Sequence, residues 1–108
     1  MAVVRIFTYR ITDWASFHLE CKEVFGFPEF YGMNLNAWID CLTYLDEGDG
    51  MSKFHLDEQE KLIVEVIDST DFKSRLPEVF EGFVESTNFV NQRYVDDGKL
   101  PKVILALS

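Results

Sequence analysis

Three short apolar segments constrain the fold of this chain more than any other feature. They are residues 2–7 (AVVRIF), 61–67 (KLIVEVI) and 102–107 (KVILAL), and each predicts a β-strand because it is rich in β-branched and aliphatic side chains. The last two are apolar almost throughout, which is typical of strands covered on both faces of a parallel sheet. With helices as right-handed crossovers, the pattern predicts an α/β fold with a small three-stranded parallel sheet and packed helices.

Two helices are predicted between the first and second strands. Thr12 is placed to cap the first helix, with Asp13 in its first turn, and Gly26 suits the position after its last turn. Asn34 is placed to cap the second helix, which is expected to run from residue 35 to about residue 45. The first helix is expected to bury one stripe, because its apolar side chains recur at spacings of three and four: Trp14, Phe17, Cys21, Val24 and Phe25.

A long helix is predicted between the second and third strands. After a helical turn at residues 69–71, Pro77 suits the first turn of a helix that runs to about Asp96. Gly82 weakens this helix by about 1 kcal/mol relative to alanine, so either close packing or the approach of a partner is expected there. The buried stripe of this helix is expected to contain Val79, Phe80, Phe83, Thr87, Val90 and Tyr94.

The second helix has an unusual outer face. At 100° per residue, its core side gathers Leu35, Trp38, Cys41, Leu42 and Leu45. The opposite side carries Asn36, Ile39, Asp40 and Thr43. An isoleucine flanked by an amide, a carboxylate and a hydroxyl fits the centre of a small contact patch. The alternative is that Ile39 is one of the scattered surface hydrophobic residues that need no explanation.

The charge of the chain restricts its partners. Ten basic and 19 acidic residues give a net charge of −9 over 108 residues, with an isoelectric point near 4.5. Nucleic acid is excluded as a partner, because affinity for a phosphate backbone comes from lysine and arginine. A basic protein would be attracted and steered, although an acidic balance is also explained by solubility alone. The length favours a single domain, residues 1–108. The oligomeric state is left open by the sequence, with a monomer favoured.

The remaining features point to a cytoplasmic protein. Cys21 and Cys41 both fall on inward helix faces, so buried reduced thiols are favoured over a disulfide. The N-terminus lacks the basic and long apolar regions of a signal peptide, and no apolar run is long enough to span a membrane. We therefore expect no membrane association.

A search for catalytic motifs yields no candidate site. The chain has no glycine-rich phosphate loop, GxSxG, CxxC or HExxH motif, and residues 46–50 (DEGDG) lack the ligand spacing of a calcium loop. His18 falls beside the buried stripe of the first helix, where a core-edge histidine with one hydrogen bond is favoured over a metal ligand. We therefore expect no enzymatic activity, no cofactor and no metal.

Residues 27–43, FPEFYGMNLNAWIDCLT, resemble the signature of the barstar family, intracellular inhibitors of secreted barnase-type ribonucleases. The family pattern runs Leu-Pro-Glu-Tyr-Tyr-Gly-x-Asn-Leu-Asp-Ala-Leu-x-Asp-Cys-Leu-Thr. The C-terminal KVILALS is similar to the last strand of the family. The chain matches the signature at Pro28, Glu29, Tyr31, Gly32, Asn34, Leu35, Ala37, Asp40, Cys41, Leu42 and Thr43.

The resemblance implies a mechanism and a set of contacts. In the family, the loop and second helix plug the active site of the ribonuclease, and helix carboxylates imitate the RNA phosphate. By resemblance, Asp40 is the main anchoring carboxylate, while Asn36 replaces a second one. The implied partner-binding residues are Phe30, Tyr31, Gly32, Asn34, Asn36, Ile39, Asp40, Thr43, Tyr44 and, beside the position of a further family carboxylate, Glu81.

Several of these positions depart from the family pattern. Phe30 replaces a tyrosine, Ile39 replaces a tryptophan, and the further acidic contact falls near Gly82. Such changes imply a diverged basic ribonuclease or toxin as the partner, because related pairs discriminate by rearranging a few contacts. The alternative is a non-nuclease interaction module on the same fold, which would use the acidic flank of Glu78, Glu81 and Glu85 or residues 46–60 instead.

Overall fold

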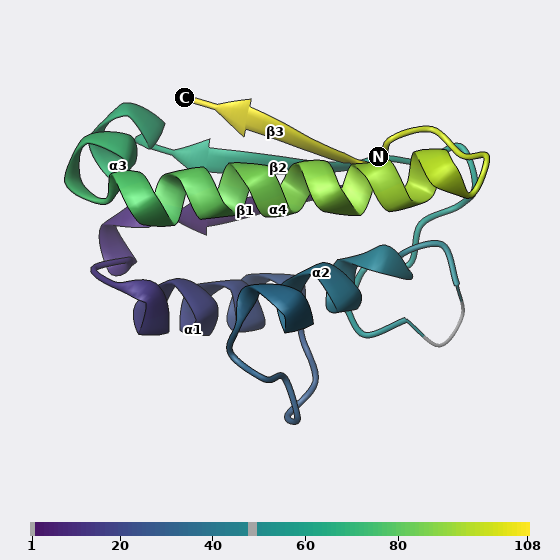
Figure 1. The fold of residues 1–108 in the computed structure, drawn as a ribbon, viewed down its shortest axis with the longest axis horizontal. Coiled ribbons are helices and arrows are strands. Elements are labelled where there is room, and N and C mark those ends of the chain that lie inside the picture. Colours follow the sequence, from purple (N-terminus) through teal and green to yellow (C-terminus); the bar gives the residue numbers. More distant parts are fainter. Residues whose placement is uncertain (1, 48–49) are drawn as a thin grey trace.

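The computed structural model describes residues 2–47 and 50–108. A pair of α-helices follows each of the first two strands, and the ribbon shows the strands on one side and the longest helix running in front of them (Figure 1). Their order is β1 (Ala2–Phe7), the short 3-10 helix η1 (Thr8–Arg10), α1 (Trp14–Phe25), α2 (Leu35–Thr43), β2 (Leu62–Ile67), α3 (Ser69–Arg75), α4 (Pro77–Asp96) and β3 (Val103–Leu107).

The sheet confirms the predicted fold class. It contains three parallel strands in the order β1-β2-β3, so the central strand is β2. The register pairs Val4 with Val64 across one side of β2, and Val64 with Leu105 across the other. The chain is therefore an α/β protein with a three-stranded parallel sheet.

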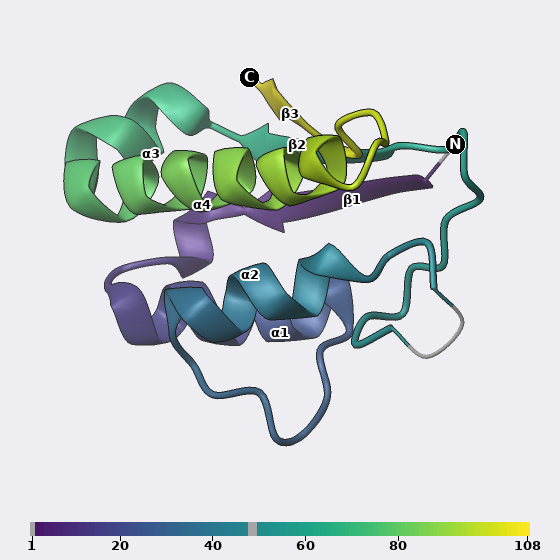
Figure 2. The same ribbon diagram turned by 45° about the vertical axis from the view of Figure 1, so that its right-hand side comes forward.

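The prediction that the strands are buried on both faces was wrong. Burial in β2 alternates, with Leu62, Val64 and Val66 fully buried and the residues between them only half-buried. On the outer face, Val3 is 45% exposed and Arg5 forms an ion pair with Glu65 at 3.0 Å. Among the described elements, the helices pack on one face: α4 runs along the strands, and α1 and α2 lie below β1 in Figure 2.

Aromatic rings fill the space between the helices and the sheet. Phe17 of α1 and Trp38 of α2 both meet Phe83 of α4 edge to face, at centroid distances of 5.7 and 5.9 Å. Phe17, Cys21 and Phe25 form the buried stripe predicted for α1. Trp14 is an exception, because it lies in the first turn of α1 and remains 37% exposed.

Gly82 is the point where three helices meet. A Cβ atom added to it would lie 2.6 Å from Trp14 Cη2 of α1 and 3.3 Å from Leu35 Cδ1 of α2. Real Cβ atoms do not come as close as the first of these distances, so a side chain here would push Trp14 away. Close packing, one of the two expectations for this glycine, is therefore confirmed.

The helix ends show which capping predictions hold. Gly26 adopts a left-handed φ of 68° after α1, and α4 begins at Pro77, both as predicted. The N-cap of α1 is Asp13 rather than Thr12: the Asp13 carboxylate accepts from Ser16 N, and the Ser16 hydroxyl accepts from Asp13 N. Asp13 rather than Thr12 is the N-cap because this reciprocal capping box satisfies two backbone amides.

Helix α2 ends at Thr43, two residues before the predicted end. The cause is Tyr94 of α4, whose buried hydroxyl donates to Leu42 O at 2.7 Å and accepts from Leu45 N at 3.0 Å. These two bonds satisfy backbone groups that would otherwise need another turn of helix. A long-range contact therefore determines where α2 stops.

Buried contacts hold the segment between α2 and β2 against the core. Ser52 Oγ donates to Phe25 O at 2.6 Å, and the buried Lys102 amino group donates to Glu58 O at 2.7 Å. Asp46 pairs with Lys99 at 2.8 Å. Of the acidic residues 46–50 (DEGDG), residues 48 and 49 lie outside the described part of the chain.

We predict that Gly82→Ala lowers the free energy of unfolding by about 1 kcal/mol. Overpacking against Trp14 costs about 1–3 kcal/mol, whereas the better helix propensity of alanine returns about 1 kcal/mol. Chemical denaturation followed by circular dichroism measures the change. In a Trp14→Ala background the same substitution should stabilise the protein by up to about 1 kcal/mol, because the propensity gain is then opposed only by the contact with Leu35 Cδ1 at 3.3 Å. Equal stabilisation in both backgrounds would contradict the packing argument.

Candidate functional site

The loop between α1 and α2 projects away from the sheet at the bottom of Figures 1 and 2. Its end is fixed by Asn34, as predicted: the side chain accepts from Ala37 N at 2.8 Å and donates to Gly32 O at 3.1 Å. Met33 between them has a positive φ of 56°, a conformation that non-glycine residues seldom adopt. Asn34 thus orients both the helix and the loop that precedes it.

Tyr31 supports the loop from inside. It is buried, and its hydroxyl shares a hydrogen bond of 2.5 Å with His18 Nδ1 of α1. Burial lowers the pKa of His18 and raises the pKa of Tyr31, so both groups stay neutral near pH 7. The interpretation of His18 as a core-edge residue with one hydrogen bond is confirmed. In the free protein Tyr31 is a support for the loop rather than an exposed contact.

The exposed apolar group of this face is Phe30, not Ile39. Phe30 is 77% exposed, whereas Ile39 is half-buried and packs against the core. The expectation that Ile39 projects outward was wrong, because its position on the helix turns it partly toward the interior. Tyr44, just after the last turn of α2, adds a second exposed ring at 39%. The aromatic part of the surface is therefore supplied by the loop and the helix end.

A shallow hollow of about 160 Å³ joins several of the predicted site residues. Phe30 and Gly32 line it from the loop, and Asp40 lines it from the outer side of α2. Met51 also lines it, although no sequence pattern placed residues 46–60 beside this loop. The full lining is Phe30, Tyr31, Gly32, Ala37, Asp40, Cys41 and Met51.

Asp40 has a partner that the sequence analysis missed. Its Oδ1 atom lies 2.9 Å from Arg93 Nη1 of α4, and the same nitrogen donates to Thr43 Oγ1 at 3.2 Å. Both charged side chains remain about half exposed, at 56% for Asp40 and 47% for Arg93. The only signal in the sequence was indirect: Arg93 precedes Tyr94, whose predicted burial sets that turn of α4 against the core.

The remaining predicted site residues, Asn36, Thr43 and Glu81, do not all lie beside Asp40. Asn36 is exposed on the outer side of α2, and Thr43 donates to Ile39 O at 2.7 Å. Glu81 lines a separate hollow with Lys73 and Phe80, between α3 and α4. The structure therefore joins Phe30, Gly32, Asp40 and Thr43 through shared contacts, and it places Glu81 on another surface.

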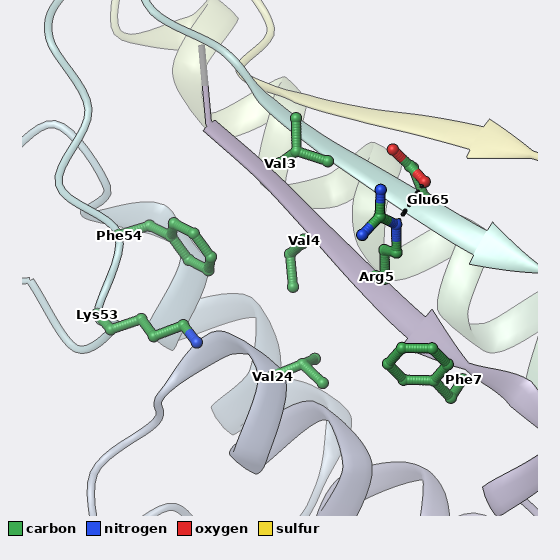
Figure 3. Close-up of a pocket in the computed structure, with 8 residues that line it drawn as sticks. All are labelled: Val3, Val4, Arg5, Phe7, Val24, Lys53, Phe54 and Glu65. Atoms are coloured by element: carbon green, nitrogen blue, oxygen red, sulfur yellow. Dashed lines mark hydrogen bonds and ion pairs between the residues drawn. The ribbon is translucent and has the colours of Figure 1, made fainter.

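A larger hollow of about 430 Å³ lies along the outer edge of β1 (Figure 3). Val3 and Arg5 line it from the strand, opposite Val24 of α1 and the side chains of Lys53 and Phe54. It contains none of the predicted site residues. Its polar groups are two cations and Glu65, which is already paired with Arg5 at 3.0 Å.

The chemistry available on the loop and α2 is that of recognition. Asp40 offers an anionic acceptor, Asn36 and Thr43 offer neutral hydrogen-bonding groups, and Phe30 and Tyr44 offer ring surface. The two thiols are free and buried, as predicted. Burial raises the pKa of Cys21 to about 12 and that of Cys41 to about 11, so neither is a thiolate near pH 7.

The fold and this surface define a small α/β protein whose most distinctive face combines exposed rings with one helix carboxylate. The chain belongs to the barstar family: the family model described as "Barstar (barnase inhibitor)" matches residues 1–106. Members of this family are inhibitors rather than enzymes, which implies a protein-binding function of the barnase-inhibitor type. Among curated proteins, none is similar enough to count as a match. Within the described residues, every helix is too short or too polar to cross a membrane.

We predict that Asn34→Ala destabilises the protein by about 1 kcal/mol, because the first turn of α2 loses its side-chain acceptor. Asn36→Ala is the matched control, since it removes an exposed amide from the same helix without touching the cap. It should leave the free energy of unfolding unchanged or raise it slightly. Both are measured by urea denaturation. Equal losses for the two variants would argue against a capping role.

We predict that His18 makes stability depend on pH below its ordinary pKa of 6.5. Burial lowers the pKa of His18 in the folded protein, so the unfolded chain binds the extra proton more readily. The free energy of unfolding should keep its full value above pH 6.5. As the pH falls below 6.5, the free energy of unfolding should decrease by at most about 1.4 kcal/mol per pH unit, until the lowered pKa of His18 is reached. Denaturation at several pH values should show a smaller slope for His18→Gln. An unchanged slope would rule out His18 as the source.

Proposed function

We propose that this protein inhibits a basic ribonuclease or ribonuclease-type toxin by covering its active site with residues 28–45. The observation that carries the proposal is the position of Asp40. By family resemblance it is the anchoring carboxylate, and its side chain is 56% exposed on the outer side of α2. In this proposal the Asp40 carboxylate takes the place of an RNA phosphate.

The ring of Phe30 supports this role for the loop. It is the most exposed large hydrophobic side chain of the described residues, and it lines the same hollow as Asp40. An exposed aromatic side chain beside a charged anchor is typical of the centre of a protein interface. The Asn34 side chain donates to Gly32 O at 3.1 Å, which fixes the turn between Phe30 and α2.

The charge of the whole chain supports a basic protein as the partner. A net charge of −9 attracts a cationic surface over a distance, and this attraction is screened by salt. The same charge opposes binding to nucleic acid. The proposal includes a monomeric, single-domain protein that acts in the cytoplasm, without a membrane partner.

The departures from the family pattern support a diverged target. Asn36 has no charge to offer a second cation. Gly82, near the further acidic contact of the family, is packed against Trp14 and Leu35 and supplies no side chain. A partner matched to this surface would therefore meet one carboxylate, Asp40, together with the rings of Phe30 and Tyr44.

A second candidate is an interaction module that binds a partner other than a nuclease. The supporting observation is the hollow of about 460 Å³ between α3 and α4, which is lined by Phe80, Glu81, Glu85 and Lys73. In that case binding would depend on Glu81 and Glu85, and it would be insensitive to changes at Asp40.

We predict that Asp40→Ala weakens binding to the cognate ribonuclease by several kcal/mol, because an arginine of the partner would be left buried without its anion. The partner is first captured from the parent cell and tested for ribonuclease activity that the protein suppresses. Titration calorimetry then compares the parent with Asp40→Ala. Asp71→Ala is the matched control, since Asp71 also pairs with an arginine, Arg75 at 2.7 Å, but on α3.

The two candidate functions give different results in this experiment. Loss of binding in Asp40→Ala, with Asp71→Ala unchanged, would support the inhibitor. Full binding by Asp40→Ala would contradict the proposal that residues 28–45 cover the active site. Loss of binding in Glu81→Gln would then favour the interaction module. Association with the inhibited ribonuclease should also slow as salt is raised.

A further inference from the structure

The carboxylate that anchors the proposed inhibitor already has a cation in the free protein. Arg93 approaches it from α4, 53 positions away in the chain, and places Nη1 2.9 Å from Asp40 Oδ1. The same Nη1 is held by Thr43 Oγ1 at 3.2 Å. Because Tyr94, the next residue, is buried and bonded to the end of α2, the backbone of Arg93 is fixed beside this helix.

This pair changes the charge that a partner meets. Asp40 and Arg93 offset each other's charge, and the neighbouring side chains of Asn36 and Thr43 carry none. Farther along, Lys99 pairs with both Asp46, at 2.8 Å, and Asp97, at 3.1 Å. The charge of Asp40 is therefore already offset in the free protein, although the chain carries a net charge of −9. A cation attracted by the whole protein does not find a free anion at this point.

We propose that Arg93 is a resident competitor for Asp40, so that any cation of a partner must displace it before pairing with this carboxylate. This inference rests on the proposed function for its biological meaning, but not for its test. Arg93 bonds Asp40 through one oxygen, Oδ1. An incoming guanidinium can bond both carboxylate oxygens with two parallel N–H groups, and so gains a bond by the exchange. A lysine ammonium is a compact point charge, which only replaces one single bond by another.

The exchange is physically feasible because the resident pair is exposed. Both side chains are about half accessible to solvent, and exposed ion pairs are weak. Arg93 can therefore swing away on its flexible side chain without disturbing the buried Tyr94 beside it. The resident pair is weak enough to be displaced, and until it is displaced it lowers the apparent affinity of every incoming cation by the same factor.

The test uses two peptides of equal charge, tetra-arginine and tetra-lysine, titrated into the full chain at low salt. The readout is the chemical shift of the Asp40 side-chain carboxyl carbon, with the Thr43 amide as a second local reporter. The variants are Arg93→Gln and the matched control Arg5→Gln. The control removes one positive charge from another exposed ion pair, Arg5 with Glu65, on the outer face of the sheet.

The parent should bind tetra-arginine more tightly than tetra-lysine at Asp40. In Arg93→Gln the apparent Kd should fall about two- to fivefold, the range expected for loss of an exposed competing pair, and by the same factor for both peptides. Arg5→Gln should resemble the parent at Asp40. Adding Asp40→Asn to Arg93→Gln should abolish the gain, which places it at this carboxylate.

Two results would overturn the inference. One is identical titration of Asp40 in Arg93→Gln and Arg5→Gln, which would show that Arg93 does not compete. The other is a gain for only one of the two peptides, because loss of a competitor raises the apparent affinity of every cation for the carboxylate by the same factor. Failure of the proposed function looks different, because Asp40→Ala would then retain full binding to the captured partner whatever the peptides show.

Discussion

The hydroxyl of Tyr94 is the contact on which the geometry of the candidate site depends. It bonds Leu42 O at 2.7 Å and Leu45 N at 3.0 Å, so one buried group of α4 ends α2 and fixes its last turn. Burial raises the pKa of Tyr94, which keeps the hydroxyl protonated and able to donate. The same turn of α4 carries Arg93 outward to Asp40. One hydrogen-bonded tyrosine thus sets both the length of the helix and the electrostatic state of its carboxylate.

Local features of the sequence were sufficient for most of the fold. The ends of β1 and α4 follow directly from a β-branched run and from Pro77, and Asn34 caps α2 because its side chain reaches an amide three residues on. These are short-range effects that involve only neighbouring residues. The family signature at residues 27–43 was also local, since it is one continuous stretch of loop and helix.

The errors came from interactions between distant segments. Apolar runs in β2 and β3 suggested burial on both faces, but hydrophobicity alone does not show whether a helix covers the second face. Helical periodicity predicted that Ile39 lies on the outer side of α2. In the structure, the packed side of this helix is wide enough to include part of the Ile39 side chain. The pairing of Asp40 with Arg93 joins residues more than fifty positions apart, and no short pattern encodes it.

Charge acts on the candidate site at two ranges: the net charge of the whole chain acts at long range, and the Asp40–Arg93 pair acts at contact distance. A net charge of −9 attracts cations toward the whole molecule, and this attraction acts over roughly 8–10 Å at physiological salt. At contact distance, a partner bound as proposed would meet a carboxylate already paired with Arg93 and the rings of Phe30 and Tyr44. Its attraction would then depend on the distributed acidic residues, and its affinity for Asp40 would depend on how strongly Arg93 competes. Because Arg93 lies on α4, a change in that helix would alter the state of Asp40 without any change in α2.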